Sequence, residues 1–299
     1  MKVVTYGTGG SLAICRSDRI NHGGNTTSLR IESECLPKGM ALAVDAGTGY
    51  HPLCMDLLKE GCNKVVTLFT HYHHDHTQGL LLVPLTYMKG IQMELFGPVE
   101  KAMGPKEVFE CLMRPPFHPV DFSEQKSHFS FVKLEHPAGI VLVFHPKGGK
   151  KRIELNEFES LEKTSGYITV GQGRFPISEC LVVRMCKTTH PEQTISYRFE
   201  ERPTGKIFVF LTDHENTDGL SMSLKAHISG ADLLIADAQY DEQIYYSRKA
   251  GFGHGTGKYV ARLAKTCGVK RVGLTHHDPE SSDEKILQIL AEAHEDADE

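Results

Sequence analysis

A dense group of potential metal ligands follows directly on a continuous apolar segment. Residues 64–70 read KVVTLFT, which is typical of a β-strand buried on both faces. The next six residues are HYHHDH, and four of them carry imidazole or carboxylate groups that suit zinc, manganese or iron: His71, His73, Asp75 and His76. Packing alone does not gather four such groups in so short a segment. The pattern therefore predicts a metal site at the end of a buried strand.

Three later segments have the same form, an apolar run that ends in a potential ligand. They end at His190, Asp213 and His276. The seven residues then divide into two ligand sets that share one carboxylate: His71, His73 and His190 for one ion, Asp75, His76 and His276 for the other, and Asp213 bridging both. Two ions about 3.5–4 Å apart can share an activated hydroxide and clamp an attacked phosphoryl or acyl group. The sequence thus predicts a binuclear site.

The order of expected strands and helices indicates an α/β protein. The first third predicts an antiparallel sheet, the middle is β-rich, and the last third alternates between strands and helices. We expect strands at residues 3–7, 26–32, 41–47, 64–70, 130–135, 140–146, 179–187, 195–200, 206–213, 231–239 and 269–276, and helices at 53–59, 80–88, 107–113, 221–228, 256–266 and 283–294. Two sheets packed face to face with helices outside form a four-layer α/β/β/α sandwich. Because no repeat or linker divides residues 1–299, we expect a single domain.

The composition excludes several other classes of protein. The 299 residues carry 33 Lys and Arg against 38 Asp and Glu, a formal charge of −5, and 40% of them are apolar, which is ordinary for a globular chain. No apolar run approaches the roughly 20 residues of a membrane helix, and the N-terminal residues alternate like a strand instead of forming a signal peptide. Eight cysteines without a CxxC pair fit free, mostly buried thiols. We therefore expect a cytoplasmic protein without a membrane segment.

Five motifs make the chain similar to the metallo-β-lactamase superfamily. Asp45 in AVDAG resembles its first motif, HYHHDH its second, and His190, Asp213 and His276 its third to fifth. Further segments resemble the phosphodiesterase branch, near ribonuclease Z and phosphoribosyl cyclic phosphodiesterase: GTGGS at 7–11, GGNTTS at 23–28, HPEQTISYRFE at 190–200, GHGT at 253–256 and THHDP at 275–279. The chain is more similar still to bacterial members with GGNTS, PPYFPV, DAQY, GHST and FHHDP signatures, whose substrate is not settled. Here Phe117 and His118 replace Tyr-Phe, and Gly255 replaces Ser, so the shape of the pocket differs.

The resemblance implies the metallo-β-lactamase fold, a hydrolase activity and a cofactor of two divalent ions, zinc or manganese with iron as an option. It also implies that His254 and Asp75 are catalytic. His254 would stabilise developing charge or protonate the leaving oxygen, and Asp75 would be catalytic as well as a metal ligand. Asp45 orients metal ligands without being one. The alternatives are an Asx turn for Asp45 and a helix-capping loop without catalysis for His254.

Other polar residues near the motifs have less defined roles. His74 and His277 adjoin proposed ligands but point away from the ions, whereas Asp237 and Asp278 could each hydrogen-bond a ligand imidazole. We expect no functional role for His118, His136 and His145. The basic residues 147–152 resemble a solvated hairpin tip more than a phosphate contact. Residues 7–11 lack the third glycine of a dinucleotide fingerprint, and Gly257-Lys258 is not part of a Walker A motif.

These features favour a phosphodiesterase that acts on small cyclic nucleotides or related phosphodiesters. A tRNA 3′-end endonuclease of the ribonuclease Z type is the second choice, followed by an acyl hydrolase of the lactonase or lactamase type. A non-catalytic metal or ligand sensor is the alternative from another class. The net charge of −5 and the lack of a long Lys-rich insertion argue against long nucleic acids as partners, and the sequence is compatible with a homodimer.

Overall fold

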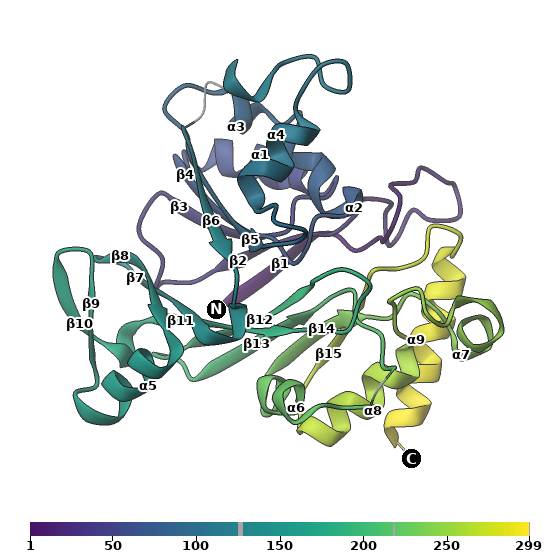
Figure 1. Ribbon diagram of the computed structural model, residues 1–299. Helices are drawn as coiled ribbons and strands as arrows, with labels where there is room; N and C mark the ends of the chain where they lie inside the picture. The colour runs from purple at the N-terminus through teal and green to yellow at the C-terminus, as the bar shows by residue number, and fades with distance from the viewer. Residues whose placement is uncertain (125–127, 218, 299) are drawn as a thin grey trace.

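The computed structural model describes residues 1–124, 128–217 and 219–298. Its first sheet has six strands in the order β1-β2-β3-β4-β5-β6 (Figure 1). As predicted, β1, β2 and β3 are antiparallel, whereas β3 to β6 run parallel. The strands are β1 (Lys2–Gly7), β2 (Ser28–Glu32), β3 (Met40–Val44), β4 (Lys64–Leu68), β5 (Gln92–Pro98) and β6 (His128–Leu134). The apolar sequence of β4 follows from its central place in this sheet, covered on both faces.

The second sheet has seven strands in the order β15-β14-β13-β12-β11-β7-β8. β13, β14 and β15 are parallel, and the other neighbours are antiparallel. The strands are β7 (Ile140–His145), β8 (Gly149–Glu154), β11 (Leu181–Lys187), β12 (Ile195–Glu201), β13 (Lys206–Leu211), β14 (Leu233–Asp237) and β15 (Val272–Thr275). The small hairpin of β9 (Tyr167–Val170) and β10 (Gly173–Pro176) packs beside the β7–β8 edge together with α5 (Leu155–Thr164). Parallel order at one side of this sheet brings the carboxyl ends of three strands to one edge.

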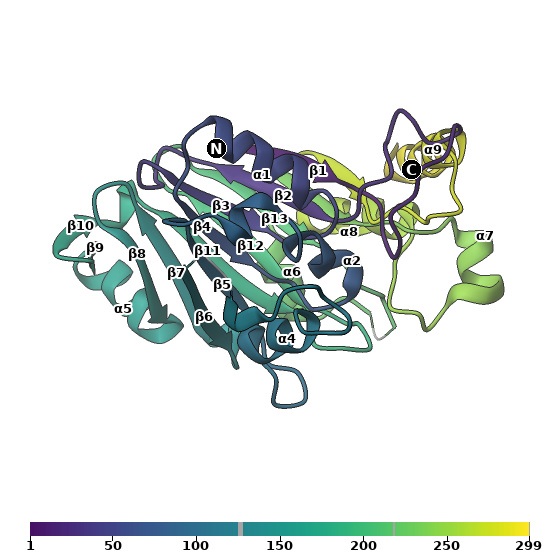
Figure 2. The ribbon, with the colours of Figure 1, turned by 90° about the horizontal axis from the view of Figure 1, so that it is seen from above.

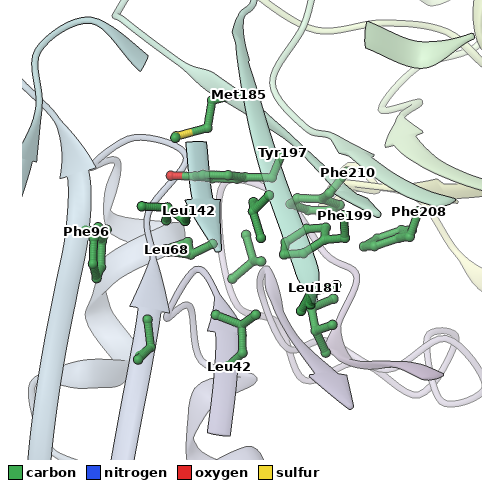
Figure 3. Close-up of a cluster of buried hydrophobic side chains, with 14 of the residues drawn as sticks. Leu42, Leu68, Phe96, Leu142, Leu181, Met185, Tyr197, Phe199, Phe208 and Phe210 are labelled. Atoms are coloured by element: carbon green, nitrogen blue, oxygen red, sulfur yellow. The ribbon is translucent and has the colours of Figure 1, made fainter. Parts of the chain in front are cut away.

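The two sheets pack face to face through one apolar core (Figure 3). Leu42 and Leu68 of the first sheet belong to the same buried cluster as Tyr197, Phe199 and Phe210 of the second. Burying a side chain of this size contributes about 1.5–3 kcal/mol, so the contact between the sheets is a main source of stability.

Helices cover the outer face of each sheet (Figures 1 and 2). One layer packs on the first sheet and consists of α1 (Tyr50–Lys59), α3 (Pro84–Tyr87) and α4 (Pro105–Leu112). The other consists of α6 (Met222–Ile228) and α8 (Gly257–Cys267) on the second sheet, with α9 (Asp283–Asp298) packed against α8. The predicted four-layer α/β/β/α sandwich is therefore confirmed. None of the helices in the described ranges has both the length and the apolar character needed to cross a membrane.

The strand β5 at Gln92–Pro98 and the helix α5 at Leu155–Thr164 were not expected from the sequence, and two expected segments differ from their prediction. The helix expected at 80–88 is reduced to a turn at Gln78–Leu80 and the single turn of α3, since Pro84 cannot continue a preceding helix and instead begins a new one. The basic run at 147–152 is only partly a hairpin tip, because its last residues lie in β8. Lys150 forms an ion pair with Glu94 of β5 and lies over the ring of Phe96, so this lysine joins the two sheets instead of projecting into solvent.

Candidate metal centre

The proposed ligands lie where strands of both sheets end beside each other. β4 leads into His71 and His73, and the short helix α2 (His74–Thr77) then places Asp75 and His76. Two hydrogen bonds join the sheets at this point: the backbone N–H of Ile195 donates to Thr70 O at 2.9 Å, and the Tyr197 hydroxyl donates to Phe69 O at 2.7 Å. These bonds bring the ligands of the first sheet against the strand ends of the second.

The first group consists of His71, His73, His190 and Asp213, whose ligand atoms all lie within 4.8 Å of one another. Asp213 Oδ2 is 3.6 Å from His71 Nε2 and 4.0 Å from His190 Nε2. Within the described residues, both of these buried nitrogens lack a hydrogen-bond partner. Burial lowers the pKa of both imidazoles, which keeps them in the neutral form that binds metals. A buried polar atom without a partner is costly, and a metal ion would satisfy both of these nitrogens.

The second group consists of Asp75, His76 and His276. His276 Nε2 lies 3.1 Å from Asp75 Oδ2 and 3.3 Å from His76 Nε2, and Asp75 Oδ2 lies 3.4 Å from His76 Nε2. Two ligands bound at about 2.1 Å to one tetrahedral ion are roughly 3.4 Å apart, so these spacings fit a metal site.

Asp213 faces both groups. Its Oδ1 lies 3.3 Å from His76 Nε2, and its Oδ2 lies 3.4 Å from His276 Nε2 and 3.6 Å from His71 Nε2. Burial opposes ionisation of this carboxyl, but the imidazoles of His276, His76 and His71 outweigh it and hold its pKa well below the usual range. The structure thus brings together all seven residues of the predicted ligand set.

Three residues that follow strands at the site adopt the left-handed backbone conformation that is uncommon outside glycine. The φ angles are 55° at Asp45, 49° at Asp213 and 61° at His276, and each residue lies just beyond the end of a strand. Such conformations concentrate at functional sites, where the surrounding structure compensates for the strain. They turn each side chain out of the strand direction and toward the cluster.

Asp45 supports the cluster as the sequence resemblance implies. It is fully buried and accepts three hydrogen bonds, from Thr70 N–H, Thr70 Oγ1 and His76 Nδ1, each at 2.8 Å. Because Nδ1 of His76 donates its proton to Asp45, Nε2 is the nitrogen that faces Asp213 and His276. Asp45 therefore fixes both the ring and its tautomer.

His254 lies at the edge of the same cluster. Its ring stacks on that of His276 with centroids 4.7 Å apart, and its Nδ1–H donates to Asp237 Oδ2 at 2.8 Å. Of the two carboxylates considered from sequence, Asp237 thus contacts His254 and not a ligand, whereas Asp278 accepts a backbone N–H from Glu280. A cavity of about 380 Å³ opens over the site and is lined by Ser11, Tyr72, His73, His74, Asp75, Asp213, His254 and His276.

Three other histidines that were considered from sequence lie outside the ligand cluster. His74 is exposed at the start of α2, while His277 is buried next to His22, with its backbone bonded to Thr8 and Gly10. His118 is buried and bonded to the Tyr87 hydroxyl, which is a structural role.

Sequence reasoning missed the way the N-terminal glycine loop contacts the site. A Cβ at Gly10 would lie 2.3 Å from Nδ1 of His276, so only glycine fits against this ring. The next residue, Ser11, donates its backbone N–H to Asp75 Oδ2 at 2.7 Å. The GTGGS segment was the available signal, although its role could not be read from the motif. Glu192 was also missed; its Oε2 lies 3.0 Å from His73 Nε2 at the rim.

Comparisons with known proteins bear on the fold. No family model matches the sequence. Ribonuclease Z of Bradyrhizobium sp. (strain ORS 278) is 36% identical over 83 residues, 28% of this chain, and the chain spans only 26% of that relative's length. Among solved structures, the metallo-β-lactamase fold protein YhfI from Bacillus subtilis matches with a TM-score of 0.58 at 17% identity, over 96% of this chain and 90% of that one. A diphosphatase from the PhnP family matches with a TM-score of 0.59 at 17% identity, with the same coverage of 96% and 90%. The protein therefore has the metallo-β-lactamase fold that its strand-end motifs predicted.

Proposed function

We propose that the protein is a metal-dependent phosphodiester hydrolase with two divalent ions, zinc or manganese with iron as an option. The observation that carries this proposal is the position of Asp213, whose two carboxylate oxygens face both ligand groups. The buried, unpartnered Nε2 atoms of His71 and His190, found among the described residues, support the fit of a cation. When bound, the two ions would supply charge stabilisation and a nucleophile from water at neutral pH.

The chain's own residues would orient the substrate and move one proton. Since Nδ1–H of His254 is held by Asp237, Nε2 is the atom that can carry a proton to the leaving oxygen. Asp237 would stabilise the imidazolium form of that ring. Asp75, fixed by the Ser11 backbone N–H, keeps a carboxylate at the floor of the cavity.

The cavities favour a small substrate with an aromatic group. Besides the space over the metal ligands, a second cavity of about 270 Å³ shares His254 and is bordered by Tyr245, Tyr246 and Tyr259. Aromatic side chains bind nucleobases by stacking, which contributes about 1–3 kcal/mol per base. Together with the net charge of −5, this supports a small cyclic nucleotide or related phosphodiester over a long polyanion.

A tRNA 3′-end endonuclease is the second candidate, favoured by the local likeness to a ribonuclease Z. The experiment that separates the two compares kcat/KM for a panel of cyclic nucleotides with that for a precursor tRNA. A binder with 6 to 10 phosphate contacts loses about 10³–10⁵ in affinity between roughly 50 and 200 mM salt. We expect efficient turnover of small diesters with a shallow salt dependence. Salt-sensitive tRNA cleavage with inert small diesters would instead establish the second candidate.

The acyl hydrolase and sensor alternatives need separate assays. Hydrolysis of a lactone or β-lactam in preference to every phosphodiester would identify an acyl hydrolase. Metal and nucleotide binding without turnover of any chromogenic phosphodiester would identify a sensor. The stacked pair of His254 and His276 argues against a sensor, because a site that only binds has no need of a positioned proton donor.

A further inference from the structure

We propose that Glu215 is a positioning residue that holds His190 and His254 in one arrangement; the inference rests on the function proposed above. The Glu215 side chain is only 3% exposed and accepts three hydrogen bonds. Its Oε1 accepts the Tyr245 hydroxyl and the Gly251 N–H, both at 2.6 Å, and its Oε2 accepts the Gly253 N–H at 2.8 Å. A buried carboxylate is destabilising unless its lone pairs are satisfied, and here the hydroxyl of Tyr245, which begins a helical turn, and two N–H groups of the loop that follows it satisfy them.

The loop that Glu215 holds makes direct contact with a proposed ligand. The carbonyl oxygen of Gly253 accepts the Nδ1–H of His190 at 2.9 Å, which leaves Nε2 of that ring as the ligand atom. Gly253 has a φ of 89°, and a Cβ at this position would lie 2.2 Å from His190 Nδ1. The loop backbone therefore has to approach the ring closely, and the carboxylate of Glu215 fixes it there.

His214 and Glu215 also bind the backbone of Thr189, the residue that precedes His190. Glu215 N–H donates to Thr189 O at 2.9 Å, and the neighbouring His214 accepts the Thr189 N–H on Nδ1 at 3.2 Å. His254 follows Gly253 directly in the chain, so its ring starts from a backbone that Glu215 has positioned. One buried carboxylate thus ties a ligand and the proposed proton donor to the strand end that carries Asp213.

Replacing Glu215 by glutamine tests this role at constant size. The amide keeps one acceptor oxygen, but its NH₂ group cannot accept a hydrogen bond. Depending on the orientation of the amide, this NH₂ faces either the N–H of Gly253 or the two donors that Oε1 now binds, the N–H of Gly251 and the hydroxyl of Tyr245. We expect amide hydrogen exchange over residues 245–256 to become at least about tenfold faster. Zinc affinity should fall by about 10- to 100-fold, the usual effect of losing the group that orients a ligand histidine. For a phosphodiester, kcat should fall while KM changes by less than about threefold.

Glu201→Gln is the matched control. Glu201 is also 3% exposed and accepts three hydrogen bonds, from the hydroxyls of Ser33 and Thr204 at 2.6 Å and from the N-terminal ammonium group at 2.5 Å. It lies at the end of β12 opposite Ile195, away from the metal centre. This control should leave zinc affinity and exchange over 245–256 unchanged. Equal effects in both variants, or unchanged exchange and affinity in E215Q, would overturn the proposal.

Two further measurements keep the test decisive. If E215Q does not fold, Gly253→Ala serves as a second variant, because it disturbs the contact between this loop and His190 at the loop residue. Normal zinc affinity in G253A would overturn the inference. Exchange and zinc affinity need no turnover, so they decide the role of Glu215 even if no phosphodiester is hydrolysed. In that case the proposed function fails while the positioning role is judged on its own.

Discussion

Asp45 Oδ2 accepts the Nδ1–H of His76 at 2.8 Å, and both side chains are completely buried. An asparagine in place of Asp45 would present either a weaker acceptor or an NH₂ group to that proton, so Asp45→Asn should lower zinc affinity by about 10- to 100-fold. Competition with a chromophoric chelator measures this loss. Asp18→Asn, at an exposed carboxylate paired with Arg16, is the control and should bind zinc like the wild type. Equal zinc affinity in D45N and wild type would show that Asp45 does not orient the ligand.

The position of Asp213 leads to a prediction about the number of metal ions that each chain binds. Since its oxygens face both ligand groups, Asp213→Ala should reduce occupancy at both positions, from two divalent ions per chain to fewer than one. His276 contacts Asp75 and His76, the bridging Asp213 and the stacked ring of His254, but none of the first-group histidines, so His276→Ala should retain the first ion. Elemental analysis of metal-replete protein gives both numbers. Full activity at one ion per chain would exclude a two-ion mechanism.

His254 and Asp237 predict a leaving-group effect. His254→Ala should keep both ions and the fold but lower kcat by about 10²–10⁴, and Asp237→Asn should act in the same direction because it presents a weaker, uncharged acceptor or an NH₂ group to the Nδ1 proton. Substrates with a nitrophenyl leaving group, which needs little protonation, should suffer least. Steady-state rates for nitrophenyl and alkyl diesters test this. Equal losses for the two would point to charge stabilisation instead of proton donation.

His227 predicts how stability depends on pH. Burial, reinforced by the positive charges of Arg198 and Arg184, lowers its pKa to about 3, against about 6.5 in an unfolded chain. Protons therefore bind the unfolded state preferentially between these values, and stability is lost as the pH falls from about 6.5 toward 3. From pH 7 to pH 5 this one group should remove about 2 kcal/mol of the free energy of unfolding.

The comparison variant is His227→Gln, which keeps a polar partner for Ser196 Oγ, now 3.1 Å from His227 Nε2. Urea unfolding at both pH values should show a smaller loss on acidification in the variant than in the wild type. A loss of the same size in both proteins would contradict a neutral, buried His227.

Several features of the site follow from local sequence. His71, His73, Asp75 and His76 lie within one short segment after an apolar strand, so their common location is a consequence of chain connectivity. Asp213 follows a similar apolar run, and ends of neighbouring parallel strands meet at one edge of a sheet. These facts made the ligand set and the layered fold predictable, although metal binding by these residues stays a prediction.

Other features depend on contacts between segments far apart in the chain. The sequence allowed Asp237 to bond any nearby imidazole; the packing of β14 against the loop after residue 250 selects His254. The link between Glu215 and Gly253 joins residues 38 positions apart and leaves no local pattern. The sequence places Lys150 in a solvated hairpin tip, whereas in the structure the contact between the sheets places it beside Glu94. Local periodicity and motifs thus determined which side chains can do chemistry, whereas the partners that orient them were decided by tertiary packing, because a hydrogen bond depends on distance in space and not on separation in sequence.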